Sequence, residues 1–197
     1  MLKNRLKSKN LILASGSPRR QELLKSLGVP FEIRIKEIDE VYPKHLKKSE
    51  ISDYLAQLKS NAFVEKLNPK DLLITSDTIV WYHNMALGKP KSKDDAFQML
   101  QKLSGKTHEV ITSVCIKSLQ KEDIFNCITK VTFKELSSEE IQFYIDNYNP
   151  MDKAGAYGIQ DWIGQIGVSK IEGSFFNVMG FPIHKIYSQL LKFSKEL

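Results

Sequence analysis

The chain contains 197 residues, carries a formal net charge of +6 at pH 7, and is 42% hydrophobic. A chain of this size buries a core without covalent staples, and its two cysteines, Cys115 and Cys127, exclude a disulfide framework. Only a short apolar run follows the basic N-terminus, which argues against a signal peptide or a membrane span and favours a cytoplasmic protein.

The first third of the chain alternates strands and helices. Leu11–Ala14 predicts a buried strand, after which Ser17 is a plausible N-cap and Pro18 suits the first position of a helix. Gly28 ends that helix, and Phe31–Ile35 predicts a second strand. The next helix is indicated by four apolar residues at helical spacing, Ile51, Leu55, Leu58 and Ala62.

The middle of the chain predicts a hairpin and paired strands. Leu72–Trp81 is a central strand that turns at His83-Asn84 and returns through Met85–Leu87. A helix begins at Ser92. Two β-rich stretches follow and are expected to pair, 110–116 and 124–133.

The last third begins with a capping box, in which Ser137 and Glu140 precede an apolar helical stripe. A glycine-rich stretch from Gly155 to Gly180 leads to a final helix over Ile183–Phe193. Because hairpins argue against a purely parallel sheet, we predict a single α/β domain over residues 1–197 with a mixed sheet.

Three stretches are candidates for chemistry, and the first is Ser15–Arg20. A strand leads through a turn into the start of a helix here, so free backbone N–H groups converge on a possible anion-binding site. Arg19 and Arg20 lie at the helix end that disfavours cations, which suggests that a bound phosphate supplies the balancing charge. Alternatively, both arginines pair with nearby acids on the surface.

The second stretch surrounds Asp77, which interrupts an apolar strand where an unpaired carboxylate is costly to bury. Lys89 follows the hairpin and could return to the same site opening as Asp77. In the third stretch, small residues around Gly155 let a backbone approach a ligand, while Lys153 and Gln160 supply a cation and an amide. Each stretch alone also fits a purely structural interpretation.

The histidines give no metal-ligand spacing, and they are expected in the core or on the surface rather than as ligands. His108 follows the Gly105-Lys106-Thr107 turn. A position at the opening of the site is a weaker interpretation of this histidine than a position in the core or on the surface.

Taken together, five motifs resemble the Maf family of nucleoside triphosphate pyrophosphatases. They occur in the family's order along nearly the whole chain: ASGSPRRQELL, SDTIV…LGKP, LSGKTHEVIT, DKAGAYGIQ and IEGSFFNVMGFP. The resemblance implies a Maf/ITPase-like fold, in which helices flank a mixed, elongated sheet with a central cleft. It also implies hydrolysis of a nucleoside triphosphate to the monophosphate and pyrophosphate, a required divalent cation (Mg²⁺ or Mn²⁺), and a homodimer.

The family's functional positions carry over to eight residues. Asp77 matches the proposed proton acceptor, and with Glu40 it would hold the metal. The phosphate-binding cations correspond to Arg20, Lys89 and Lys153. The specificity positions of the branch that acts on dTTP and UTP correspond to Arg19, Thr78 and Gln160.

The chain departs from the family pattern twice. A lysine that relatives carry in an A-x-x-K-A pattern is assigned to Asn61, with Lys59 nearby. The usual glycine after Gln160 is Asp161, followed by Trp162. The first departure concerns one phosphate contact, and the second concerns the base pocket.

We therefore predict a dTTP/UTP pyrophosphatase whose partner is a small nucleotide, canonical or modified on its pyrimidine, with no stable nucleic acid and no membrane. Two alternatives stay open. One is a pyrophosphatase of the branch that acts on methylated GTP. The other is a nucleic-acid-binding or cell-division regulatory protein without turnover, which would need a contiguous basic face.

Overall fold

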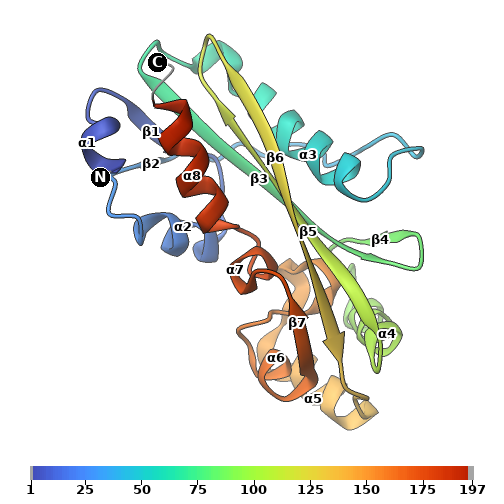
Figure 1. The fold of residues 1–197 in the computed structure, drawn as a ribbon. Helices are drawn as coiled ribbons and strands as arrows, with labels where there is room; N and C mark the ends of the chain where they lie inside the picture. The colour runs from blue at the N-terminus through green and yellow to red at the C-terminus, as the bar shows by residue number, and fades with distance from the viewer. Residues whose placement is uncertain (1, 195–197) are drawn as a thin grey trace. The chain divides into compact units, whose positions relative to one another are not determined.

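A computed structural model describes residues 2–194, whose α-helices and strands are labelled in Figure 1. The strands are β1 (Asn10–Leu13), β2 (Glu32–Ile33), β3 (Asp71–Tyr82), β4 (Met85–Leu87), β5 (Thr107–Lys117), β6 (Glu122–Phe133) and β7 (Val168–Glu172). The α-helices are α1 (Leu2–Arg5), α2 (Pro18–Lys25), α3 (Ser49–Asn61), α4 (Lys93–Leu103), α5 (Ser138–Tyr148), α6 (Trp162–Gly167), α7 (Phe175–Val178) and α8 (Ile183–Phe193). Three short 3₁₀ helices complete the set: η1 (Val64–Lys66), η2 (Pro150–Asp152) and η3 (Ala154–Ala156).

The strands form one seven-stranded mixed sheet, which confirms the predicted fold class. Its order is β2-β1-β3-β5-β6-β7, and β4 pairs with β3 beside this path. β1 runs parallel to β2 and β3, whereas the β3–β4 and β6–β7 pairs are antiparallel. Local sequence signals explain several boundaries: the predicted hairpin bend has positive φ at His83 and Asn84, and Ser137 and Glu140 form the predicted capping box.

The chain divides into two compact units. The first comprises the described residues of Met1–Asp77, Thr112–Cys127 and Gly180–Leu197, and the second comprises Thr78–Ile111 and Ile128–Met179. The strands β3, β5 and β6 each contribute residues to both units. The prediction of a single domain stays a prediction.

In the first unit, the parallel pairing of β1 and β3 determines which chain segments meet. Leu13 lies opposite Ile74, and the backbone N–H of Ala14 donates to the Ile74 carbonyl at 2.9 Å. Parallel strands end at the same edge of a sheet, so the turn after β1 lies beside Asp77. Ile12 of β1 and Leu73 of β3 pack in a buried cluster that also includes Phe63 and Leu67.

The second unit has its own apolar core, formed by β-strand residues and by the inner faces of α4, α5 and α6. Leu100, Val131, Ile145 and Ile163 are fully or almost fully buried in this cluster. The core supports the glycine-rich segment that carries Gln160.

Candidate functional site

Arg20 extends from the first turns of α2 toward the middle of β3. The helix begins as predicted, with Ser17 at the N-cap in an extended conformation and Pro18 in the first turn. Arg20 Nε donates to the Gly180 carbonyl at 2.9 Å, and Nη1 donates to the Ser76 carbonyl at 2.8 Å. Two backbone contacts from separate segments therefore hold this guanidinium beside the residue that precedes Asp77.

The charge of Arg20 is shaped by opposing effects. Burial lowers the pKa of the Arg20 guanidinium, and the nearby Asp77 and Glu40 carboxylates raise it. An arginine stays protonated at any physiological pH. The first unit thus supplies a permanent cation next to Asp77.

Asp77 lies in a charged cluster together with Lys59 and Glu40. Its side chain is buried, and Lys59 Nζ lies 2.5 Å from Asp77 Oδ1 and 2.8 Å from Glu40 Oε1. Three separate elements supply these groups: β3, α3 and the loop between β2 and α3. Two carboxylates therefore converge on one ammonium, as the assignment of both to one site requires.

The carboxylates fit a divalent cation. Among residues 2–194, no group of three or more His, Cys, Asp and Glu side chains is arranged to hold a metal ion. Mg²⁺, however, is commonly bound through only one or two carboxylates, with substrate phosphates and water as its other ligands. Asp77 and Glu40 offer hard oxygen donors of this kind, and their side chains already share one cation.

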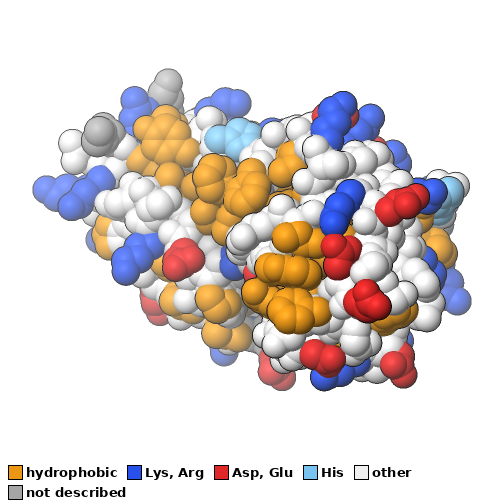
Figure 2. All heavy atoms as spheres, turned by 90° about the horizontal axis from the view of Figure 1, so that it is seen from below, with side chains coloured by type: hydrophobic (Ala, Val, Ile, Leu, Met, Phe, Trp, Pro, Cys, Tyr) orange, Lys and Arg blue, Asp and Glu red, His pale blue; other side chains and the backbone are white. Residues whose placement is uncertain are grey.

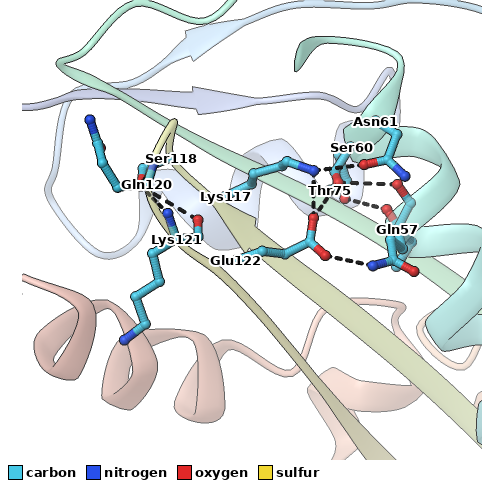
Figure 3. Close-up of polar contacts among 10 residues, drawn as sticks. Gln57, Ser60, Asn61, Thr75, Lys117, Ser118, Gln120, Lys121 and Glu122 are labelled. Carbon is cyan, nitrogen blue, oxygen red and sulfur yellow. Dashed lines mark hydrogen bonds and ion pairs between the residues drawn. The ribbon is translucent and has the colours of Figure 1, made fainter.

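Polar contacts anchor α3, the helix that carries Lys59, to β5 and β6 (Figure 3). Lys117 Nζ donates to Asn61 Oδ1 and to Glu122 Oε2, each at 2.6 Å. The other Glu122 oxygen accepts from Gln57 Nε2 at 2.6 Å. These contacts fix the rotation of α3 and, with it, the direction of Lys59.

Lys59 is a charged neighbour of Asp77 and Glu40 that the sequence interpretation did not include among the candidate site residues. Lys59 contacts Asp77, whereas Asn61 accepts from Lys117, and the assignment of Asn61 to the family lysine stays a prediction. Residues two positions apart lie on different faces of a helix, so only one of them can reach the cluster. The spacing itself held the signal, since Ala56 and Lys59 already fit A-x-x-K.

The second unit brings the segments of Lys89 and Lys153 together. The Gly155 N–H donates to the Gly88 carbonyl at 3.0 Å, which joins the residue before Lys89 to the turn after Lys153. Gly155 has a φ of +68°, and a Cβ there would lie 2.8 Å from Val80. Only glycine fits this approach without strain.

Lys153 and Gln160 both lie near Asp161. Lys153 Nζ is 2.8 Å from Asp152 Oδ1 and 3.8 Å from Asp161 Oδ2. Gln160 Nε2 donates to Asp161 Oδ1 at 3.0 Å. The second unit therefore groups three of the predicted substrate-binding residues, Lys89, Lys153 and Gln160, around one glycine-rich segment.

The remaining predicted positions are partly buried. Arg19 lies in the first turn of α2. Thr78 follows Asp77 in β3.

His108 belongs to the core of the second unit rather than to a reactive site. Its Nε2 lies 2.7 Å from the Tyr157 hydroxyl, and its ring packs against Phe133 and Tyr157. Burial lowers the pKa of His108 to about 4. The imidazole is therefore neutral near pH 7.

This burial predicts an acid-dependent loss of stability. The pKa of His108 is about 4 in the folded state, against 6.5 for an unperturbed histidine, so the unfolded chain binds the proton first as the pH falls. Between pH 7 and pH 5, the wild type should lose about 2 kcal/mol more unfolding free energy than His108→Gln. Urea unfolding at both pH values measures the difference, and equal losses would contradict the assignment.

The surface and the helices bear on the alternative functions. On the face shown in Figure 2, Lys and Arg side chains of the described residues are interspersed with Asp, Glu and hydrophobic side chains rather than forming one basic surface. Within residues 2–194, every helix falls short of the length and apolar character that crossing a bilayer requires.

Comparison with known proteins agrees with the motifs. The family described as Maf-like protein matches residues 10–193. A dTTP/UTP pyrophosphatase from Flavobacterium psychrophilum is 59% identical over 191 residues, which cover 97% of this chain and 98% of that protein. A protein of the same name from Flavobacterium johnsoniae is 56% identical over 96% of this chain and 98% of that protein. Another, from Phocaeicola vulgatus, is 53% identical over 98% of this chain and 100% of that protein. A solved nucleoside-triphosphatase / dITP/XTP pyrophosphatase from Mycobacterium abscessus has a TM-score of 0.47 and 13% identity, over 95% of this chain and 97% of that one.

Proposed function

Because this chain belongs to the Maf family, we propose that it hydrolyses nucleoside triphosphates, with dTTP and UTP as its substrates, to the monophosphate and pyrophosphate. The observation that carries the proposal is the charged cluster in the first unit. Asp77 and Glu40 share the Lys59 ammonium, and Arg20 lies beside them. A cluster that holds both carboxylates and cations suits a reaction in which a water loses a proton and a phosphate gains negative charge.

Asp77 is the proton acceptor in this proposal. Its carboxylate is buried and accepts from Lys59, which fixes its direction. A carboxylate held in this way can take the proton of a water that attacks a phosphorus of the triphosphate. The P–O bond that links the α and β phosphates then breaks, and the leaving group carries away the additional negative charge.

Cations stabilise that charge. Arg20 and Lys59 lie in the charged cluster around Asp77, and Lys89 and Lys153 are the other cations that the family resemblance assigns to the phosphates. Their positive charges balance the phosphate oxygens best when the leaving group is most negative, which lowers the barrier. A divalent cation, Mg²⁺ or Mn²⁺, would be held by Asp77 and Glu40, and when bound it would neutralise phosphate charge.

Arg19, Thr78 and Gln160 recognise the base. A guanidinium donates to a pyrimidine carbonyl, and the Gln160 amide matches part of the edge that uracil and thymine share. Threonine is short enough to leave room for the ring. A cytoplasmic location suits these substrates, and the homodimer stays a prediction.

The function is tested by pyrophosphate release from a panel of UTP, dTTP, CTP, GTP and a methylated GTP, each with Mg²⁺ and with EDTA. We expect turnover of UTP and dTTP that EDTA abolishes. A preference for methylated GTP would reassign the branch. Salt-dependent gel shifts with DNA and RNA provide the other arm, and nucleic-acid binding without metal-dependent turnover would overturn the proposal.

Gln160→Ala tests the reading of the base. In the wild type, kcat/KM for UTP should exceed that for CTP by at least about tenfold, because mispaired buried donors and acceptors cost about 1–3 kcal/mol. Gln160→Ala should narrow this gap more than it slows UTP hydrolysis. Gln142→Ala, at an exposed position of α5, is the matched control. An unchanged gap in Gln160→Ala would remove this residue from recognition.

A further inference from the structure

Asp161 occupies the N-cap position of α6 without capping the helix. Its backbone is extended, but its side chain makes no capping hydrogen bond to the helix N–H groups. The carboxylate instead links two side chains. Oδ2 accepts from the Tyr144 hydroxyl at 2.7 Å, and Oδ1 accepts from Gln160 Nε2 at 3.0 Å.

Tyr144 determines which oxygen of Asp161 is available to Gln160. Its hydroxyl oxygen accepts from the Gly158 N–H at 3.0 Å, so its own proton is left to donate to Asp161. Burial and the neighbouring Asp161 raise the pKa of Tyr144, which keeps the hydroxyl protonated. Oδ2 is thus committed to Tyr144, and Oδ1 is the oxygen that faces Gln160.

The carboxylate determines which way the Gln160 amide points. An ionised carboxylate only accepts hydrogen bonds, so the Gln160 NH₂ group must face it and the carbonyl oxygen must face away. That oxygen, Oε1, is buried and has no hydrogen-bond partner among the described residues. A buried, unpaired carbonyl is costly, and a ligand that brings an N–H group would satisfy it.

From this geometry we propose that Asp161 is a positioning residue for base specificity, because it presents Gln160 Oε1 as an acceptor to the N3–H of uracil or thymine. The inference rests on the proposed function and deepens it. Cytosine has a lone pair on N3 instead of a proton, so the same oxygen would meet a second acceptor. The discrimination against CTP then depends on the carboxylate behind Gln160 as well as on Gln160 itself.

Asp161→Asn tests the proposal with a change of nearly equal size. Tyr144 still donates, so the carbonyl of the substituted side chain should face Tyr144 and its NH₂ group should face Gln160. The Gln160 amide must then turn over, which brings Nε2 toward the base. The UTP-to-CTP ratio of kcat/KM should fall at least fivefold, with CTP hydrolysed faster than by the wild type.

Two further variants make the result decisive. Asp161→Ala removes the acceptor without adding a donor. Its UTP-to-CTP ratio of kcat/KM should also fall, but by less than that of Asp161→Asn. This variant provides the test if Asp161→Asn does not fold. Asp152→Asn is the matched control, because it also removes a carboxylate near Lys153, whereas the carboxylate that accepts from Gln160 is that of Asp161. Its ratio should equal that of the wild type.

The outcomes separate this inference from the proposed function. A wild type that releases no pyrophosphate from UTP would overturn both. A wild type that prefers UTP, with an unchanged ratio in Asp161→Asn and Asp161→Ala, would overturn only the role of Asp161. A fall in Asp152→Asn as large as in Asp161→Asn would also overturn it, because charge near Lys153 would then explain the effect.

Discussion

Asp77→Asn is expected to lower kcat for UTP by at least about 10³-fold while leaving the protein folded. The substitution preserves the size of the side chain and removes its charge. An amide cannot take a proton from water and is a poor ligand for a divalent cation, so both proposed roles of Asp77 are lost together. Pyrophosphate release at saturating UTP and Mg²⁺ measures the effect.

Stability should change much less than activity. Breaking a fully buried ion pair costs about 3–5 kcal/mol, but Lys59 keeps Glu40 as a partner and is 18% exposed, so the loss here should be smaller. Thermal unfolding followed by circular dichroism checks this. Asp94→Asn, at an exposed position in the first turn of α4, is the matched control and should retain full activity. A wild-type kcat in Asp77→Asn would exclude Asp77 from the mechanism.

Lys59→Met is expected to lower kcat/KM for UTP by about 10²-fold. Methionine keeps most of the length of the side chain and removes the ammonium that contacts Asp77 and Glu40. The carboxylates then repel each other without an intervening cation, and the phosphates lose one of their four proposed cations. Steady-state kinetics over a range of UTP concentrations measures the change and separates kcat from KM.

Lys66→Met in the short helix η1 is the control for removing a lysine from the same unit, because Lys66 is exposed. Its kinetics should match those of the wild type. If Lys59→Met changes kcat/KM by less than threefold, the contact with Asp77 serves only the fold. A large loss in Asn61→Ala alone would instead support the original assignment of the family lysine.

The motifs were recognisable in the sequence because they are local and carry unusual chemistry. Gly16-Ser17-Pro18 followed by two arginines marks a turn and a helix start within a few residues, and the structure has both. The hairpin at His83-Asn84 and the capping box of Ser137 and Glu140 were predictable for the same reason. Each depends on backbone conformations and hydrogen bonds among neighbours in the chain.

The identity of the third charged residue beside Asp77 was not predictable in this way. Lys59 and Asn61 are separated by one residue, and both are polar positions in α3. Of the predicted apolar stripe, Ile51 and Leu55 are buried, whereas Leu58 is only partly buried and Ala62 follows the end of the helix. Which of them faces Asp77 depends on the rotation of α3. That rotation is fixed by Lys117 and Glu122, which belong to strands about 60 residues later in the chain.

The sequence alone therefore determined most of the strands and helices, the turns that carry the motifs and the family to which the chain belongs. It did not predict α6, β7 or α7 within the glycine-rich stretch. Only the tertiary structure decided which side chains share a proton or a charge: Lys59 with Asp77 and Glu40, and Asp161 with Gln160 and Tyr144. The physical reason is the distance along the chain over which each kind of interaction acts. Backbone preferences and caps act over about four residues, whereas hydrogen bonds and ion pairs between side chains depend on packing that brings distant segments within about 3 Å of each other.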